Sequence, residues 1–175
     1  LGSNGENFVT ELNAQQKNTD KKVAEFDAFL TKFDLSNFDQ SLEDQLDSAK
    51  NKLNTVIANR MTVQSLNIST NSAMNAYTDM NAAFLNTVAL VSRISSQSEM
   101  TDLISAYVNF LKGKERADIE RAVMANTFAA DYFGTGMFNK FVSLVAEQNV
   151  YNDVFLSFAN NKQKSMFASK MQDES

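Results

Sequence analysis

The chain has 175 residues, a net charge of −5 at pH 7, and no Pro, Cys, His or Trp. Without His and Cys, three kinds of site are excluded by residue type: histidine acid–base catalysis, Ser-His-Asp or Cys-His nucleophiles, and thiolate or imidazole metal sites. The acidic balance argues against nucleic acid as a partner, because phosphate binding needs a basic field.

The scarcity of turn residues predicts a helical protein. No Gly or Pro occurs between Glu6 and Lys112. Sheet proteins need frequent turn residues with a positive or fixed φ, so all-β and α/β folds are disfavoured. The hydrophobic fraction of 43% is that of a globular protein, so this segment must fold back on itself. The composition therefore predicts long helices joined by turns of Asn, Ser and Asp.

Helical spacing of apolar residues predicts two helices in the N-terminal part. The first covers Glu6–Phe33, and Asp34–Gln40 interrupts it and supplies caps. The second begins near Asp39 and carries an inward stripe at 4-3 spacing that reaches Arg60. The other members of this stripe are Leu42, Leu46, Ala49, Leu53 and Val56. The polar cluster 67–72 is predicted to form a turn.

Three further helices are predicted after this turn. The third has the stripe Met74, Tyr77, Asn81, Phe84, Val88 and Val91, and a capping box of Ser96 and Glu99 follows it. The fourth, Met100–Tyr132, has the stripe Leu103, Tyr107, Phe110, Lys114, Ala117, Arg121, Met124 and Phe128. It ends at a Gly-containing turn, 133–136, with a left-handed cap, and the fifth helix begins near Met137. Its inward positions are Phe141, Leu144, Val145, Gln148, Tyr151, Phe155 and Phe158.

Five such segments joined by short polar turns predict an all-α fold, an antiparallel up-down bundle of about five helices with a four-helix core. The length fits one domain or two small stacked bundles that share helices. We expect a single helical domain over residues 1–175. No stretch is long and apolar enough for a membrane span.

Cationic residues within the apolar stripes are the candidate binding residues. Lys114 and Arg121 are about 20° apart around their helix, and Arg60 interrupts the second helix in the same way. Small neighbours of Arg121 (Ala117, Ala122 and Ala125) leave room for a counter-ion. A guanidinium suits a small planar oxyanion because it donates two parallel hydrogen bonds. The alternative is that the arginines pair with Glu115, Glu120 or Glu147, or reach water.

Other polar residues in these helices have either a structural role or a choice between a structural and a ligand-binding role. Gln148 and Asn81 either orient a ligand or set the helix register. Arg116 and Glu120 are predicted to pair on the exposed face, and Gly113 marks a kink or a close helix crossing. The carboxylates have no paired apolar setting that would raise a pKa, so no enzyme, cofactor or metal is predicted.

The stretch Lys114-Glu115-Arg116-Ala117-Asp118-Ile119-Glu120-Arg121-Ala122 resembles the KE-x-A-G-x-ERA signature of the bacterial nitrate- and nitrite-sensing (NIT) domain. Phe128-Ala129 before a Gly-containing turn and the later Glu147-Gln148 are also similar to the family. The resemblance covers nearly the whole chain. Asp118 stands where the family usually has Gly, and Gln16 where Arg is frequent. The family's first helix with its ERG-x-S motif is expected to precede Leu1.

The resemblance implies an all-α sensor module that binds nitrate or nitrite between helices through arginines. Arg121 matches the arginine of the family's ERA motif, and Arg60 lies where a helix arginine is common. With Lys114 and Gln148 they form the expected ligand site. The expected protein is a membrane receptor, a methyl-accepting chemotaxis transducer, with a periplasmic sensor domain. It is expected to be a homodimer through flanking segments and held in the inner membrane by helices outside this chain.

Two other hypotheses remain open at this point. The first is a structural or dimerisation bundle without a small-molecule ligand, which predicts no response to anions. The second keeps the sensor fold but exchanges the ligand for an organic acid or a protein partner. Arginines paired with glutamates would favour the structural bundle.

Overall fold

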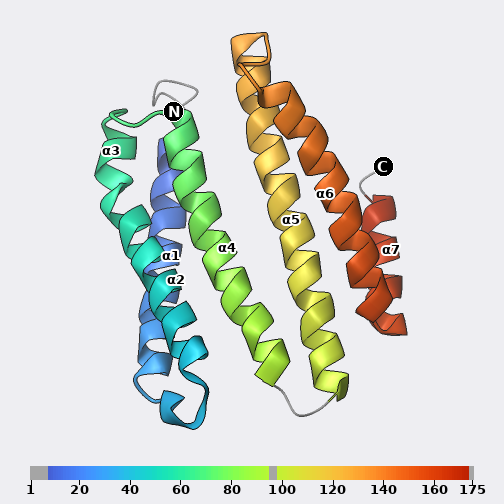
Figure 1. Ribbon diagram of the computed structural model, residues 1–175. Coiled ribbons are helices and arrows are strands. Elements are labelled where there is room, and N and C mark those ends of the chain that lie inside the picture. The colour runs from blue at the N-terminus through green and yellow to red at the C-terminus, as the bar shows by residue number, and fades with distance from the viewer. Residues whose placement is uncertain (1–7, 95–97, 174–175) are drawn as a thin grey trace. The chain divides into compact units, whose positions relative to one another are not determined.

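The computed structural model describes residues 8–94 and 98–173, and its regular structure is entirely helical (Figure 1). No strand occurs in these residues, so the predicted all-α helical bundle is confirmed. The elements in order are α1 (Val9–Leu30), a 3-10 turn η1 (Leu35–Asn37), α2 (Gln40–Ala58), α3 (Arg60–Gln64), α4 (Thr70–Ile94), α5 (Ser98–Ala130), α6 (Met137–Phe158) and α7 (Asn161–Asp173). The chain divides into two compact units, 1–77 and 78–175, with the boundary inside α4.

In the unit 1–77, α1 and α2 are antiparallel neighbours. The predicted stripe of α2 is confirmed, because Leu42, Leu46, Ala49, Leu53 and Val56 are its buried side chains. Helix α1 has none that is fully buried. Two ion pairs join it to the next helices: Lys50 Nζ lies 3.2 Å from Asp27 Oδ1, and Arg60 Nη1 lies 2.7 Å from Asp20 Oδ1.

Short polar side chains make the turn between α1 and α2, as predicted. Asp34 accepts hydrogen bonds from the Ser36 amide at 3.0 Å and the Ser36 hydroxyl at 2.6 Å, which closes η1. Asp39 is the N-cap of α2 and accepts from the Ser41 amide at 2.8 Å. These carboxylates satisfy amides that a helix start leaves unpaired, so the chain reverses without Gly or Pro.

The cap carboxylate of Asp39 makes stability depend on pH. Hydrogen bonds from the Ser41 hydroxyl and amide lower the pKa of Asp39 below its usual 3.8. A lowered folded pKa means that the stabilisation is present above pH 3.8 and is lost as the pH falls through the folded pKa. We expect Asp39→Asn to lower Tm at neutral pH, with a difference from wild type that shrinks in acid. Thermal melts at about pH 7 and about pH 3 check this. A difference that stays constant with pH would contradict it.

Two helix boundaries differ from the prediction. Arg60 does not continue the second helix, because α2 ends at Ala58 and Arg60 begins the short helix α3. The C-terminal segment breaks after Phe158 and continues as α7, which the sequence did not predict. Asn160 Oδ1 accepts from the Gln163 amide and Gln163 Oε1 accepts from the Asn160 amide, both at 2.9 Å. This reciprocal capping box starts the new helix.

The predicted turn at 67–72 is confirmed at its start, since α4 begins at Thr70. Ser96, of the predicted capping box with Glu99, lies outside the described residues.

In the unit 78–175, α5 and α6 form a long antiparallel pair. In the connection between α5 and α6, Asp131 (φ 61°) and Gly136 (φ 76°) adopt left-handed backbone conformations. The left-handed residue that follows α5 is therefore Asp131 and not the predicted Gly. Gly113 is buried against α6, where an added Cβ would lie 3.1 Å from Asn152 Oδ1. The close helix crossing expected at Gly113 is therefore present.

The buried stripes of α4 and α5 lie one residue before the predicted ones. In α5 the buried residues include Ala106, Gly113 and Thr127, whereas Tyr107, Lys114 and Phe128 are exposed. In α4 they include Ala83 and Thr87 instead of Phe84 and Val88. The prediction followed 4-3 spacing and therefore placed Lys114 and Arg121 in the stripe of α5. Val108, Ile119 and Val123 are also buried in α5. At Gly113 the close approach of α6 leaves no room for a larger side chain.

Helix α7 packs on α5 and α6 through one aromatic side chain. Phe167 lies with its ring centroid 5.2 Å from that of Phe155 and 6.4 Å from that of Phe110. Phe110 and Phe155 are 5.6 Å apart, so the three rings form one cluster. Ala106 and Ala159 complete the core around it.

Candidate ligand site

The four predicted site residues are found in both units. Arg60 belongs to the unit 1–77, and Lys114, Arg121 and Gln148 belong to the unit 78–175. The arrangement within each unit decides what these side chains are able to bind.

Arg121 and Lys114 share one carboxylate on the surface of α5. Arg121 Nη2 lies 3.2 Å from Asp118 Oδ1, and Lys114 Nζ lies 2.5 Å from Asp118 Oδ2. The Arg121 side chain is 81% exposed, so it is not in the predicted buried stripe. This follows from the one-residue shift of the stripe, which turns both cations outward. Two positive charges thus bind Asp118, the residue that stands where the KE-x-A-G-x-ERA signature has Gly.

Arg60 is the more buried arginine. Its side chain is 16% exposed at the start of α3, and its guanidinium is bound to Asp20 of α1. Of the two oxyanion-binding candidates, this one has the lower local dielectric, where an ion pair is stronger. Any anion that binds here must compete with the Asp20 carboxylate.

The glutamates considered as partners of Arg60 and Arg121 have other partners. Glu115 accepts from Asn81 Nδ2 at 2.8 Å, and Glu120 accepts from Gln148. Glu147 forms an ion pair with Arg116 between α5 and α6. The predicted Arg116–Glu120 pair on the exposed face is therefore wrong, because the side chain of Arg116 is mostly buried and bridges two helices. Asn81 and Gln148 each bind a glutamate of α5, which agrees with the interpretation that they set helix register.

Lys114 and Gln148 come together in the lining of one cavity between α5, α6 and α7. Its volume is about 600 Å³. The polar side chains of the lining are Lys114, Gln148, Asn152, Gln163 and Lys170. The apolar ones are Phe110, Ala117, Phe155, Met166, Phe167 and Met171, and Tyr107 and Gly113 complete it. The residues from α7 were missed because that helix was not predicted; the Asn160 and Gln163 pair was the signal that could have revealed it.

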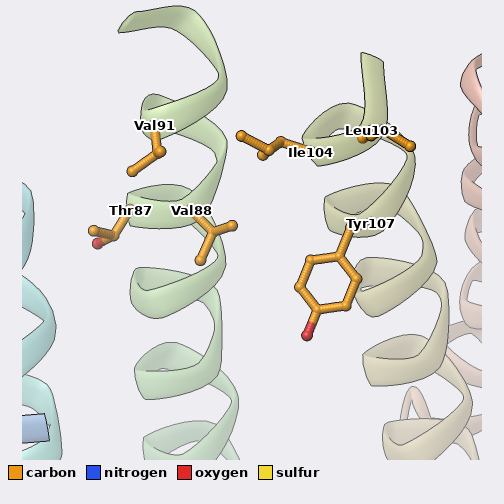
Figure 2. A pocket seen from close by; sticks show the side chains of 6 residues that line it. All are labelled: Thr87, Val88, Val91, Leu103, Ile104 and Tyr107. Carbon is orange, nitrogen blue, oxygen red and sulfur yellow. The ribbon is translucent and has the colours of Figure 1, made fainter. Parts of the chain in front are cut away.

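A second cavity, between α4 and α5, has an almost purely apolar lining. Its volume is about 410 Å³, and it is lined by Thr87, Val88, Val91, Leu103, Ile104 and Tyr107. Val88, Ile104 and Tyr107 point into the space between the two helices (Figure 2). Four of the lining residues belong to the predicted stripes of these helices. The only hydroxyl groups of this lining belong to Thr87 and Tyr107, and that of Thr87 already donates to the Ala83 carbonyl.

None of the helices in the described part of the chain combines the length and the hydropathy of a membrane-spanning segment. The same residues contain no group of three or more carboxylates placed to hold a metal ion.

The comparisons with known proteins give one match. The family model described as nitrate and nitrite sensing (NIT) matches residues 1–175, which is the whole chain. No curated protein and no solved structure matches the chain significantly.

Proposed function

Because the chain belongs to the nitrate and nitrite sensing (NIT) family, we propose that it binds nitrate, nitrite or a similar small anion as the sensor domain of a bacterial membrane receptor. The match over all 175 residues is the observation that carries this proposal. The finer assignment is the periplasmic domain of a methyl-accepting chemotaxis transducer in the inner membrane. It acts as a homodimer through flanking segments, and helices outside this chain provide the membrane anchor.

The proposed ligand residues are Arg121, Arg60, Lys114 and Gln148. A guanidinium offers an oxyanion two parallel hydrogen bonds, and Lys114 next to Arg121 adds a second positive charge. In the unit 78–175 the anion takes the position that Asp118 now holds between Lys114 and Arg121. In the unit 1–77 it replaces Asp20 at Arg60. Exchange of an intramolecular carboxylate for a free anion changes which helix residues are tied together.

Such an exchange of a carboxylate for an anion is able to transmit a signal, because it changes the contacts between helices. The pair Arg60–Asp20 connects α3 to α1, so its release alters the packing of these helices, whereas Lys114 and Asp118 belong to one helix, α5. An anion shifts the populations of two packings only if it binds one of them more tightly. A small displacement of one helix is then passed to flanking segments.

Isothermal titration calorimetry with nitrate and with nitrite tests this function. We expect saturable binding to the wild type, and a Kd at least about tenfold higher in Arg121→Ala or Arg60→Ala, from loss of a charge-assisted bidentate contact. The arginine whose replacement raises Kd identifies the unit that holds the site. Lys164→Ala, an exposed cation of α7, is the control and leaves Kd unchanged. Equal binding by wild type and both arginine variants would refute the assignment.

A structural or dimerisation bundle is the second candidate, and two observations favour it. Arg60 and Arg121 both have a carboxylate partner within the protein, as a structural arginine would. On α5 the exposed positions Tyr107 and Phe128 also leave apolar surface for a second helix. This function predicts no heat of binding with either anion and a dimer in sedimentation experiments that persists when Arg121 is replaced.

A further inference from the structure

The cavity between α5, α6 and α7 is larger than a small oxyanion requires. Its volume of about 600 Å³ falls within the range of roughly 300–1,000 Å³ that is typical of pockets for organic ligands. Helices α5, α6 and α7 each contribute side chains to its wall. A planar anion of the size of nitrate would contact one side and leave the apolar wall without a partner.

The charge of the lining favours a negative ligand. Lys114 and Lys170 contribute ammonium groups from α5 and α7, and Gln148, Asn152 and Gln163 contribute amides. None of the described residues that line the cavity is Asp or Glu. Lys114 binds Asp118, which is outside the lining, but an ammonium has three donor hydrogens and can bind a ligand carboxylate at the same time.

The rest of the lining suits an apolar body. Phe110, Phe155 and Phe167 pack against one another and present aromatic surface from all three helices. Met166 and Met171 of α7 line the same cavity and are largely exposed. Methionine side chains adapt to irregular ligand shapes, and covering their exposed surface favours binding.

From this lining we propose that the cavity between α5, α6 and α7 binds an organic carboxylate with an apolar aromatic or alkyl body. The carboxylate lies toward Lys114 and Lys170, and the body lies against the three phenylalanines and the two methionines. Such a ligand contacts α7 as well as the α5–α6 pair, so binding strengthens the attachment of α7. This site goes beyond the sensing of nitrate and does not depend on it.

The test uses 3-phenylpropanoate as probe, 3-phenylpropanamide as an uncharged probe of the same shape, and nitrate, each titrated calorimetrically. Wild type is expected to bind the carboxylate saturably and at least about tenfold more tightly than the amide, because only the carboxylate forms charge-assisted bonds. Ala117→Phe places a ring in the cavity and is expected to raise Kd for the carboxylate at least about tenfold. The matched control is Ala125→Phe, another exposed alanine of α5 that does not line the cavity.

Lys170→Met is expected to raise Kd for 3-phenylpropanoate and to leave Kd for 3-phenylpropanamide unchanged. Lys164→Met, on the same helix, is the control. The inference is overturned if 3-phenylpropanoate does not bind, if the amide binds as well, or if Ala117→Phe and Ala125→Phe behave alike. The nitrate titrations separate the two proposals. If nitrate binds and 3-phenylpropanoate does not, only the proposed carboxylate site is refuted. If 3-phenylpropanoate binds and nitrate does not, only the proposed nitrate function is refuted.

Discussion

Replacement of Phe155 by Ala is expected to lower the free energy of unfolding by about 3–5 kcal/mol, the usual cost of deleting a buried aromatic side chain. Phe155 is 5% exposed and contacts both Phe110 and Phe167, with which it forms the aromatic cluster under α7. Its loss removes apolar burial and leaves a cavity between three helices. Urea unfolding followed by far-ultraviolet circular dichroism measures the change.

Phe158 supplies the matched control for this prediction. It is on the same helix but is 44% exposed, so Phe158→Ala is expected to cost about 1 kcal/mol or less. A comparable loss in both variants would show that the cluster around Phe155 does not contribute more than ordinary helix propensity and surface contact.

Replacement of Asp118 by Asn is expected to raise the affinity for nitrate about tenfold, because it removes the internal anion that competes for two cations. The Asp118 carboxylate lies 2.5 Å from Lys114 Nζ and 3.2 Å from Arg121 Nη2. The amide has nearly the same shape but no charge, so it releases both side chains without creating space. Calorimetric titration at constant ionic strength measures the effect, since salt screens exposed charges.

Asp102→Asn is the control for the change in net charge. Asp102 is exposed on the same helix and is separated from the cations by more than two turns. If both variants raise the affinity equally, the gain comes from overall charge, and Asp118 does not act as a local competitor. An affinity that falls in Asp118→Asn would place Asp118 among the groups that position Arg121 for the ligand.

The sequence predicted the elements whose causes are local. Asp34 and Asp39 accept hydrogen bonds from residues only two positions ahead, so their turn and cap could be read from neighbouring residues. The stripe of α2 was also correct, because its leucines are both the largest apolar residues and the buried ones. Arg121 became a candidate through its place in the predicted stripe and through its motif, and the structure contradicts the first of these.

The sequence by itself therefore determined that the protein is helical, where most of its helices end, and which cations are candidates for an anion. Only the tertiary structure decided which face each helix buries. Ala106 and Gly113 face inward in place of Tyr107 and Lys114, because close approach of two backbones rewards a small side chain more than apolar area. That shift of one residue leaves Lys114 and Arg121 on the surface of α5 and brings Arg116 to Glu147 of α6. Pairs between helices and the cavity beneath α7 depend on these packing distances, which no local pattern of residues encodes.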